Sequence, residues 1–318
     1  MAIVLLTRPL PDPVMKEMNR SFTLIGNLED RPITRKELLK QVPDADALVV
    51  TLTDTVDIEV FARAPRLKVV AVYAAGYNNV DIATAIGCGI IVTNTPDVLT
   101  ETTADLTWGL LLAVSRRIPE GERLVREHRW TGWAPSQFLG SEVHGKTLGI
   151  IGMGRIGQAV ARRASGFGMP VIYSSRRGAV PEGEKILNGH QVPLPTLLAT
   201  ADFVSLHVPL TEHTHHLIGK EQLALMRRTA YLINTARGAV VDEAALAEAL
   251  TAGHPAGAGL DVYEHEPHIH PDLLRLPNVV VLPHLGSATW ETRVRMGMMV
   301  MENIAAALSG KEPPNRVT

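Results

Sequence analysis

The chain has 318 residues, of which 46% are hydrophobic, and a formal net charge of −2 at pH 7. This length and composition suit two globular domains and differ from the composition of disordered proteins. The near-zero charge argues against a nucleic-acid partner, which would need a basic face. The single cysteine, Cys88, excludes an internal disulfide framework and fits a reducing compartment.

The N-terminus is predicted to form a buried strand and not an export signal. Its apolar run, AIVLL, is short, and no basic residue precedes it, whereas a signal peptide has a basic start and a longer apolar stretch. No apolar run approaches the roughly 18 residues that a membrane helix needs. We therefore expect a cytoplasmic protein without a membrane partner.

Short apolar or β-branched segments alternate with helical segments along the whole chain. Several are apolar at consecutive positions, which is typical of strands buried on both faces of a parallel sheet. The alternation predicts a doubly wound α/β architecture. The predicted strands are Ile3–Thr7, Ala47–Val50, Lys68–Tyr73, Ile90–Thr93, Thr147–Gly152, Val171–Ser174, Phe203–His207, Tyr231–Asn234, Ala258–Val262 and Val279–Pro283.

The position of the glycine-rich motif predicts the domain organisation. It begins only at Gly152, so about half of the chain precedes the nucleotide fold. The C-terminal segment is mostly one predicted helix, Trp290–Leu308, and is too short to be a domain. We expect it to pack on the N-terminal half. The predicted domains are a discontinuous substrate domain (1–98 and 288–318) and a dinucleotide-binding domain (99–287), with a ligand cleft between them.

The segment TLGIIGMGRIGQAV places the pattern Gly152-x-Gly154-x-x-Gly157 between a predicted strand and a predicted helix. In that setting the pattern is typical of a dinucleotide-binding turn. The first glycine allows the tight turn, the second admits the pyrophosphate, and the third lets the helix lie close to the strand. The phosphates would meet free amides at the helix N-terminus. An ordinary glycine turn is the alternative.

The end of the next strand predicts which dinucleotide is bound. Ser174 lies 17 residues after Gly157 (157 to 174), where an NAD-binding fold usually has an acid that binds the ribose hydroxyls. A neutral serine removes the repulsion that a carboxylate exerts on a 2′-phosphate. Ser175 is followed by Arg176 and Arg177, whose forked donors suit phosphate oxygens. We expect NADP(H) to be preferred and NAD(H) to be possible; a solvated Arg-Arg turn with mixed cofactor use is the alternative.

Three polar residues follow predicted strands, at the sheet edge where α/β proteins bind ligands: Arg237, Glu266 and His284. Arginine can bind a carboxylate through two parallel hydrogen bonds. Histidine can donate a proton to a carbonyl oxygen near neutral pH, and a neighbouring carboxylate favours its protonated form. Together the residues predict reduction of a 2-keto acid. Taken singly, a surface ion pair, a loop acid and a hydrogen-bonded histidine are the alternatives.

Longer motifs surround these residues, and through them the sequence resembles the D-2-hydroxyacid dehydrogenase family, in particular its bacterial glyoxylate/hydroxypyruvate reductase (2-ketogluconate reductase) branch. The motifs are AGYNNVD (75–81), NTPDVLTETTAD (94–105), KTLGIIGMGRIGQ (146–158), HVPLT (207–211), INTARGAVVDEAAL (233–246), AGLDVYEHEP (258–267) and LPHLGSATWETR (282–293). The resemblance implies a Rossmann domain inserted in a flavodoxin-like substrate domain, and D-2-hydroxy acids as products.

The resemblance also implies roles by position. Arg237 would bind the substrate carboxylate and keto oxygen, and His284, paired with Glu266, would be the acid/base. Asp261 would hold the nicotinamide carboxamide, and Thr103 would contact the cofactor. The other implied substrate contacts are Leu52, the backbone amides of Ala75 and Gly76, and Trp133. The other implied cofactor contacts are Arg155, Ile156, His207, Pro209, Thr235, Ala236, His284 and Gly286.

Trp130, Trp133 and Phe138 lie close together in a loop-like stretch. Such a gathering of aromatic residues indicates an interface, and the resemblance implies a homodimer in which Trp133 approaches the partner's active site. A local aromatic cluster is the alternative. Histidines gather in two further segments, 207–216 and 265–270. Neither has a recognised ligand spacing, so we expect no metal site.

Two other functions are compatible with this fold, because a fold alone does not determine function. One is a non-catalytic dinucleotide sensor, and the other is a dehydrogenase of formate or phosphite. The complete set of Arg237, Glu266 and His284 favours an enzyme. The favoured function is NADPH-linked reduction of a small 2-keto acid, with glyoxylate, hydroxypyruvate and 2-ketogluconate as candidate substrates.

Overall fold

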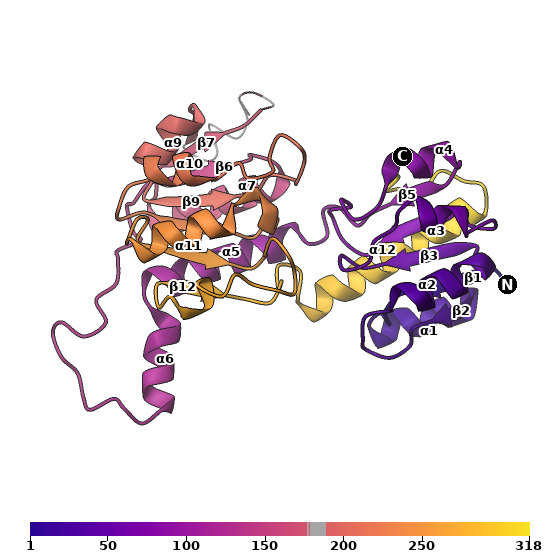
Figure 1. Ribbon diagram of the computed structural model, residues 1–318, viewed down its shortest axis with the longest axis horizontal. Helices are drawn as coiled ribbons and strands as arrows, with labels where there is room; N and C mark the ends of the chain where they lie inside the picture. Colours follow the sequence, from indigo (N-terminus) through magenta and orange to yellow (C-terminus); the bar gives the residue numbers. More distant parts are fainter. Residues whose placement is uncertain (177, 179–188) are drawn as a thin grey trace. The chain divides into compact units, whose positions relative to one another are not determined.

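The computed structural model describes residues 1–176, 178 and 189–318 (Figure 1). The chain divides into two compact units. Unit 1 comprises Met1–Leu99 and Ser287–Thr318, and unit 2 comprises Thr100–Gly286. The polypeptide therefore leaves unit 1 once, completes unit 2, and returns to unit 1.

Unit 1 contains a five-stranded parallel sheet with the order β2-β1-β3-β4-β5, which is the flavodoxin-like arrangement. The central strands β3 and β4 are buried at every position, which explains their unbroken apolar runs. The strands are β1 (Ile3–Leu6), β2 (Thr23–Gly26), β3 (Ala47–Val50), β4 (Val69–Val72) and β5 (Ile91–Thr93). The helices are α1 (Asp12–Ser21), α2 (Arg35–Gln41), α3 (Ile58–Ala62), α4 (Ile82–Gly87) and α12 (Trp290–Leu308), with a 3-10 turn η1 (Val42–Asp44).

The C-terminal helix α12 packs on β4 and on α1 within unit 1. Gly297 of α12 lies against Val14 of α1, so closely that a β-carbon at Gly297 would lie 2.6 Å from the Val14 side chain. The Nδ2 atom of Asn303 also donates a hydrogen bond to the carbonyl oxygen of Asn94, at 3.3 Å. The end of the chain is thus an integral part of unit 1.

Unit 2 contains a seven-stranded parallel sheet with the order β12-β11-β10-β9-β6-β7-β8. Six of these strands follow the Rossmann order, and β12 extends the sheet. The strands are β6 (Leu148–Ile151), β7 (Val171–Ser174), β8 (Gly189–Gln191), β9 (Phe203–Leu206), β10 (Tyr231–Asn234), β11 (Gly257–Leu260) and β12 (Val279–Val281). The helices are α5 (Thr100–Ser115), α6 (Ile118–Arg126), α7 (Arg155–Ala164), α9 (Leu194–Thr200), α10 (Lys220–Leu225) and α11 (Glu243–Thr251), with 3-10 turns η2 (Ser165–Phe167), η3 (Gly238–Val240) and η4 (Leu273–Arg275).

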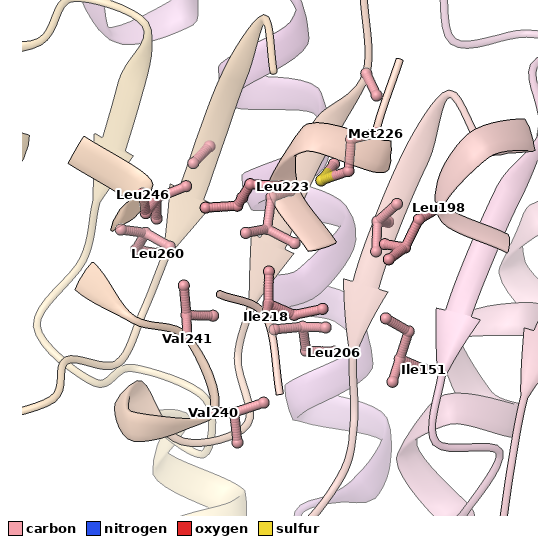
Figure 2. Packing of buried hydrophobic residues seen from close by; sticks show 14 of the residues in the cluster. Ile151, Leu198, Leu206, Ile218, Leu223, Met226, Val240, Val241, Leu246 and Leu260 are labelled. Atoms are coloured by element: carbon pink, nitrogen blue, oxygen red, sulfur yellow. The ribbon is translucent and has the colours of Figure 1, made fainter. Parts of the chain in front are cut away.

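The core of unit 2 lies on both faces of its sheet. Adjacent residues of a strand point to opposite faces, and accordingly Ile150 and Ile151 of β6 join different buried clusters. Ile151 packs in the cluster of α9, α10 and α11, where Leu198, Leu223 and Leu246 meet the strands (Figure 2). The other cluster lies under α5 and α7. The prediction of two parallel-sheet α/β domains is confirmed.

Two strands, β2 and β8, are absent from the sequence-based prediction. Each lies at one of the two edges of its sheet, and each has only one neighbouring strand and little buried surface. An edge strand does not need the continuous apolar run by which the central strands were recognised. Among the described helices, none is both long and apolar enough to cross a membrane.

Candidate active site

The three glycines of the glycine-rich motif lie in the turn from β6 to α7, and the structure separates their roles. Gly152 has a φ of 97°, and a β-carbon there would lie 2.6 Å from the carbonyl oxygen of His207. A β-carbon at Gly157 would lie 2.2 Å from the carbonyl oxygen of Gly152. By contrast, a β-carbon at Gly154 would meet no described atom within 4 Å. Packing of the chain therefore requires the first and third glycines, whereas the second faces open space.

That open space lies at the N-terminus of α7, where Arg155 and Ile156 form the first turn. Gly154 is the N-cap residue, and it provides no side-chain cap for the helix. Uncapped amides at a helix N-terminus bind anions, aided by the helix dipole. An anion-binding helix end beside a backbone cradle fits the pyrophosphate of a dinucleotide, so these residues suit that cofactor.

Ser174, the last residue of β7, lies directly beside this turn. Its carbonyl oxygen accepts a hydrogen bond from the Gly152 amide at 2.9 Å. The next residue, Ser175, accepts a hydrogen bond from Gln191 Nε2 at 2.8 Å through its carbonyl oxygen, and Arg176 is exposed. Arg177 lies outside the described residues. The strand therefore ends in a neutral side chain at the position predicted for the ribose contact.

The strand order brings the other candidate residues of unit 2 to one edge of its sheet. Because β9, β10, β11 and β12 are neighbours and parallel, their carboxyl ends lie side by side. His207 and Pro209 follow β9, and the segment 235–237 follows β10. Asp261 follows β11, and His284 follows β12. Residues up to 77 positions apart in sequence (207 to 284) thus share one edge.

Asp261 holds the turn that carries His284. It is fully buried, and its Oδ1 and Oδ2 atoms accept hydrogen bonds from the amides of Leu285 (2.6 Å) and Gly286 (2.8 Å). Its backbone oxygen accepts a hydrogen bond from the His284 amide at 2.9 Å. Burial raises the pKa of Asp261 above its ordinary value despite these donors. Thr103 of α5 supports the same turn, since its hydroxyl donates to the Gly286 carbonyl oxygen at 2.9 Å.

His284 and Glu266 form a hydrogen-bonded pair. The Nδ1 atom of His284 lies 2.8 Å from Glu266 Oε2, and both side chains are about a quarter exposed (26% and 27%). His284 has a φ of 56°, a left-handed conformation that non-glycine residues rarely adopt and that often occurs at functional sites. The turn fixed by Asp261 imposes this conformation and so aims the imidazole at Glu266.

The Glu266 side chain is also held in place by its own segment of the chain. Its Oε1 atom accepts a hydrogen bond from the Tyr263 amide at 3.1 Å, and the Tyr263 hydroxyl donates to the Leu282 carbonyl oxygen at 2.7 Å. Burial tends to raise the pKa of Glu266, but the hydrogen bond and charge of His284, with Arg237 nearby, outweigh it. The pKa of Glu266 therefore lies below its ordinary value, and the carboxyl is ionised at neutral pH.

Arg237 follows β10 on a turn that is held by hydrogen bonds to the Asn234 side chain. Asn234 Oδ1 accepts from the Ala236 amide and Nδ2 donates to the Arg237 carbonyl oxygen, both at 3.0 Å. The next residue, Gly238, lies very close to Tyr263. A β-carbon at Gly238 would lie 1.8 Å from the carbonyl carbon of Tyr263. Burial lowers the pKa of Arg237, partly offset by Glu266, but a guanidinium remains charged.

His207 and Thr235 complete this edge. The Nε2 atom of His207 lies 2.8 Å from the Ser205 hydroxyl, and desolvation lowers the pKa of His207 to about 3, so the ring is neutral at pH 7. The hydroxyl of Thr235 lies 2.9 Å from that of Thr107 on α5. The edge thus combines one cation, one carboxylate-bound histidine and one neutral histidine.

Comparison with known proteins identifies this arrangement. Residues 108–286, more than half of the chain, match the family model described as the D-isomer specific 2-hydroxyacid dehydrogenase, NAD binding domain. The chain belongs to the D-isomer specific 2-hydroxyacid dehydrogenase family. It is therefore an oxidoreductase with a dinucleotide-binding domain, and the predictions of the family and of an enzyme are confirmed.

Individual members of the family resemble this dehydrogenase over its whole length. A protein of Korarchaeum cryptofilum named glyoxylate reductase is 53% identical, covering 99% of this chain and 95% of its own. A solved protein of Thermus thermophilus is 48% identical with a TM-score of 0.92, covering 99% of this chain and all of its own. An NADPH-dependent glyoxylate/hydroxypyruvate reductase of Sinorhizobium meliloti, solved with NADP and malonate, is 34% identical with a TM-score of 0.88, covering 100% of this chain and 97% of its own.

The remaining predicted residues of this dehydrogenase do not follow the strands β9 to β12 of unit 2. Leu52 follows β3, and Ala75 and Gly76 follow β4, all at the carboxyl edge of the unit 1 sheet. The Ala75 carbonyl oxygen accepts a hydrogen bond from Asn94 Nδ2 at 2.7 Å. Trp133 is 82% exposed in the segment that follows α6 in unit 2.

Sequence reasoning missed three residues that shape this site: Asn234, Gly238 and Tyr263. Asn234 and Gly238 flank Arg237 in INTARG, and Tyr263 lies in the motif that contains Glu266. A polar residue within an apolar strand was the available signal for Asn234, because a buried amide needs partners. The closeness of Gly238 to Tyr263 depends on tertiary packing and left no signal in the sequence.

Proposed function

We propose that this dehydrogenase is an NADPH-preferring reductase of small 2-keto acids that produces D-2-hydroxy acids. Glyoxylate is the favoured substrate, and hydroxypyruvate and 2-ketogluconate are further candidates. The observation that carries the proposal is the hydrogen bond between His284 and Glu266 on the sheet edge that also carries Arg237. The names of the K. cryptofilum and S. meliloti proteins support the choice of substrate.

In this proposal Arg237 binds and orients the substrate. Its guanidinium offers parallel donors that match a carboxylate and reach the adjacent keto oxygen. The turn fixed by Asn234 and Gly238 limits its movement, which favours one orientation of the bound acid. Leu52, the amides of Ala75 and Gly76, and Trp133 are the proposed additional substrate contacts.

His284 is the proposed proton donor to the keto oxygen. Since Nδ1 is occupied by Glu266, Nε2 is the ring nitrogen that faces the substrate. The ionised Glu266 stabilises the protonated ring before transfer and keeps its orientation afterwards. NADPH, when bound, supplies the hydride that reduces C2.

The proposed cofactor contacts follow the shape of the site. The first turn of α7 (Gly154, Arg155 and Ile156) would bind the pyrophosphate. The 2′-phosphate would be bound by Ser174, Ser175, Arg176 and Arg177. Near the nicotinamide, the neutral His207 can accept a hydrogen bond where a charged ring could not. The other proposed cofactor contacts at this end are Thr103, Gly152, Gly157, Pro209, Thr235, Ala236, Asp261, His284 and Gly286.

We also propose that the enzyme is a homodimer formed through α6 and the segment that follows it. This part of unit 2 extends away from its sheet (Figure 1). It exposes large apolar side chains that one chain leaves uncovered, and such patches are typical of interfaces. The exposed apolar side chains are Ile118, Val125, Trp130, Trp133 and Leu139, each at least 53% exposed.

The experiment that tests the proposed function is a set of initial rates at the nicotinamide absorbance band. NADPH and NADH are each combined with glyoxylate, hydroxypyruvate, 2-ketogluconate and pyruvate, and formate and phosphite oxidation are assayed with both oxidised cofactors. The proposal predicts the highest kcat/KM with NADPH and glyoxylate, and D-glycerate as the product from hydroxypyruvate. Oxidation of formate or phosphite without any reduction of a keto acid would refute it.

A further inference from the structure

Two histidine-containing segments of unit 2 meet where they continue beyond the ends of β9 and β11. His215 and His216 lie in the loop between β9 and α10, and Glu264 lies in the segment that follows β11. One potential ligand atom from each residue lies within 4.8 Å of the other two. From this we propose that His215, His216 and Glu264, which have no role in the proposed reduction, form a binding site for a Zn²⁺-type transition-metal ion.

The two imidazoles and the carboxylate already face one another. The His216 Nε2 atom lies 2.7 Å from Glu264 Oε1, and the rings of His215 and His216 stack with centroids 4.0 Å apart. Ligand atoms around tetrahedral zinc are about 3.4 Å apart, given Zn–N bonds of about 2.1 Å. The three ligand atoms lie within 4.8 Å of one another, so they would need to approach by at most about 1.4 Å to reach this spacing.

The backbone under the ligands is held in place. His216 has a φ of 49°, and its amide donates to the carbonyl oxygen of Ala239 in η3 at 2.8 Å. The amide of Glu264 donates to the carboxylate of Glu243, a side chain only 7% exposed. Both ligand segments are thus fixed to the same stretch of chain, which lowers the entropy lost on binding.

The donor set selects the class of metal. Two imidazole nitrogens and one carboxylate oxygen suit Zn²⁺ and its neighbours, with water completing the coordination. Ca²⁺ and Mg²⁺ need a set made of oxygen atoms. The side chains of His216 and Glu264 are 35% and 19% exposed, and His215 is exposed, so an ion can enter from solvent. Bound there, it would tie the β9–α10 loop to the segment that leads to Glu266.

No metal site was predicted from the sequence, because neither histidine segment has a recognised ligand spacing within itself. The ligands proposed here come from both segments, and His216 and Glu264 are 48 positions apart. Only the fold, through the parallel strands β9, β10 and β11, brings them together.

The test uses the full-length protein without a histidine tag, stripped with EDTA and titrated with ZnCl₂ by calorimetry. We expect one ion per chain with micromolar or tighter affinity. His215→Ala and Glu264→Gln should each weaken binding at least tenfold. His213→Ala and His265→Ala, matched exposed histidines in the same two segments, should leave the affinity unchanged. His216→Asn also removes one imidazole and tolerates the left-handed backbone, so it should weaken binding without unfolding the loop.

A second readout identifies the ligands directly. Co²⁺ substituted for Zn²⁺ should give visible absorption bands of a four- or five-coordinate ion, and these bands should disappear in His215→Ala. Zn²⁺ should also raise the thermal midpoint of the stripped protein but not that of Glu264→Gln. Absence of saturable binding would overturn the proposal. So would equal affinities of the wild type and the ligand variants, because the ion would then occupy other histidines.

Discussion

The Nδ1 atom of His284 lies 2.8 Å from Oε2 of Glu266, although 18 positions separate the two residues in sequence. They meet because β11 and β12 are adjacent and parallel, and because Asp261 holds the turn of His284 in a left-handed conformation. A carboxylate on Nδ1 fixes the tautomer and the direction of Nε2. The pair is therefore the element on which the proposed chemistry depends most.

Removing this pair should reduce turnover and spare cofactor binding. His284→Ala should lower kcat for glyoxylate by about 10²–10⁴-fold, the usual contribution of a general acid. Glu266→Gln should have a smaller effect, because the imidazole remains. NADPH affinity, measured by fluorescence titration, should stay within about threefold of the wild type. His265→Ala, an exposed neighbour, is the control; an unchanged kcat in His284→Ala would remove the proposed role.

Substitution of the second and third glycines of the turn should affect different properties: the second, cofactor binding, and the third, the stability of unit 2. Gly154→Ala should leave the thermal midpoint nearly unchanged, since its β-carbon would meet no described atom within 4 Å, but should weaken NADPH binding at least tenfold. Gly157→Ala should instead destabilise unit 2 by about 2 kcal/mol or more, because its β-carbon would lie 2.2 Å from the Gly152 carbonyl oxygen. Thermal denaturation and NADPH titration of both variants check this. Tight NADPH binding by Gly154→Ala would contradict the placement of the pyrophosphate.

Cofactor preference should depend on charge at the end of β7. Ser174→Asp places a carboxylate beside the Gly152 turn, where it would repel a 2′-phosphate and bind the ribose hydroxyls of NADH. We expect the ratio of kcat/KM for NADPH over NADH to fall at least tenfold. Arg176→Ala combined with Arg177→Ala should likewise weaken NADPH far more than NADH. Equal losses for both cofactors would show that this segment does not read the 2′-phosphate.

The neutral His207 should make unit 2 sensitive to acid. Its pKa is lowered from 6.5 to about 3 by desolvation, so the unfolded chain binds a proton between those values and the folded chain does not. Its contribution to stability is intact above pH 6.5 and is lost as the pH falls toward 3. Between pH 7 and pH 4.5 this amounts to about 2 kcal/mol. Urea unfolding should show that His207→Gln loses less stability than the wild type over this range; parallel losses would contradict a desolvated, neutral ring.

Features set by local patterns were predictable from the sequence. The apolar runs of β3, β4 and β6 identified central strands, and the strand–glycine–helix order located the dinucleotide turn. Features that depend on tertiary packing were not. The left-handed backbone of His284, the closeness of Gly238 to Tyr263, and the meeting of His216 with Glu264 each join segments distant in sequence. The edge strands β2 and β8 were not predicted from the sequence, because little of their surface is buried.

The most direct test of the central claim is the transfer of deuterium from NADPH deuterated on the reactive face of nicotinamide C4 to glyoxylate, with the product examined by mass spectrometry. The proposed function predicts glycolate with one deuterium at C2, formed in equal amount to the cofactor oxidised, and formed more slowly when labelled NADH replaces NADPH. Cofactor binding without labelled glycolate, or label in the product of another substrate only, would contradict it.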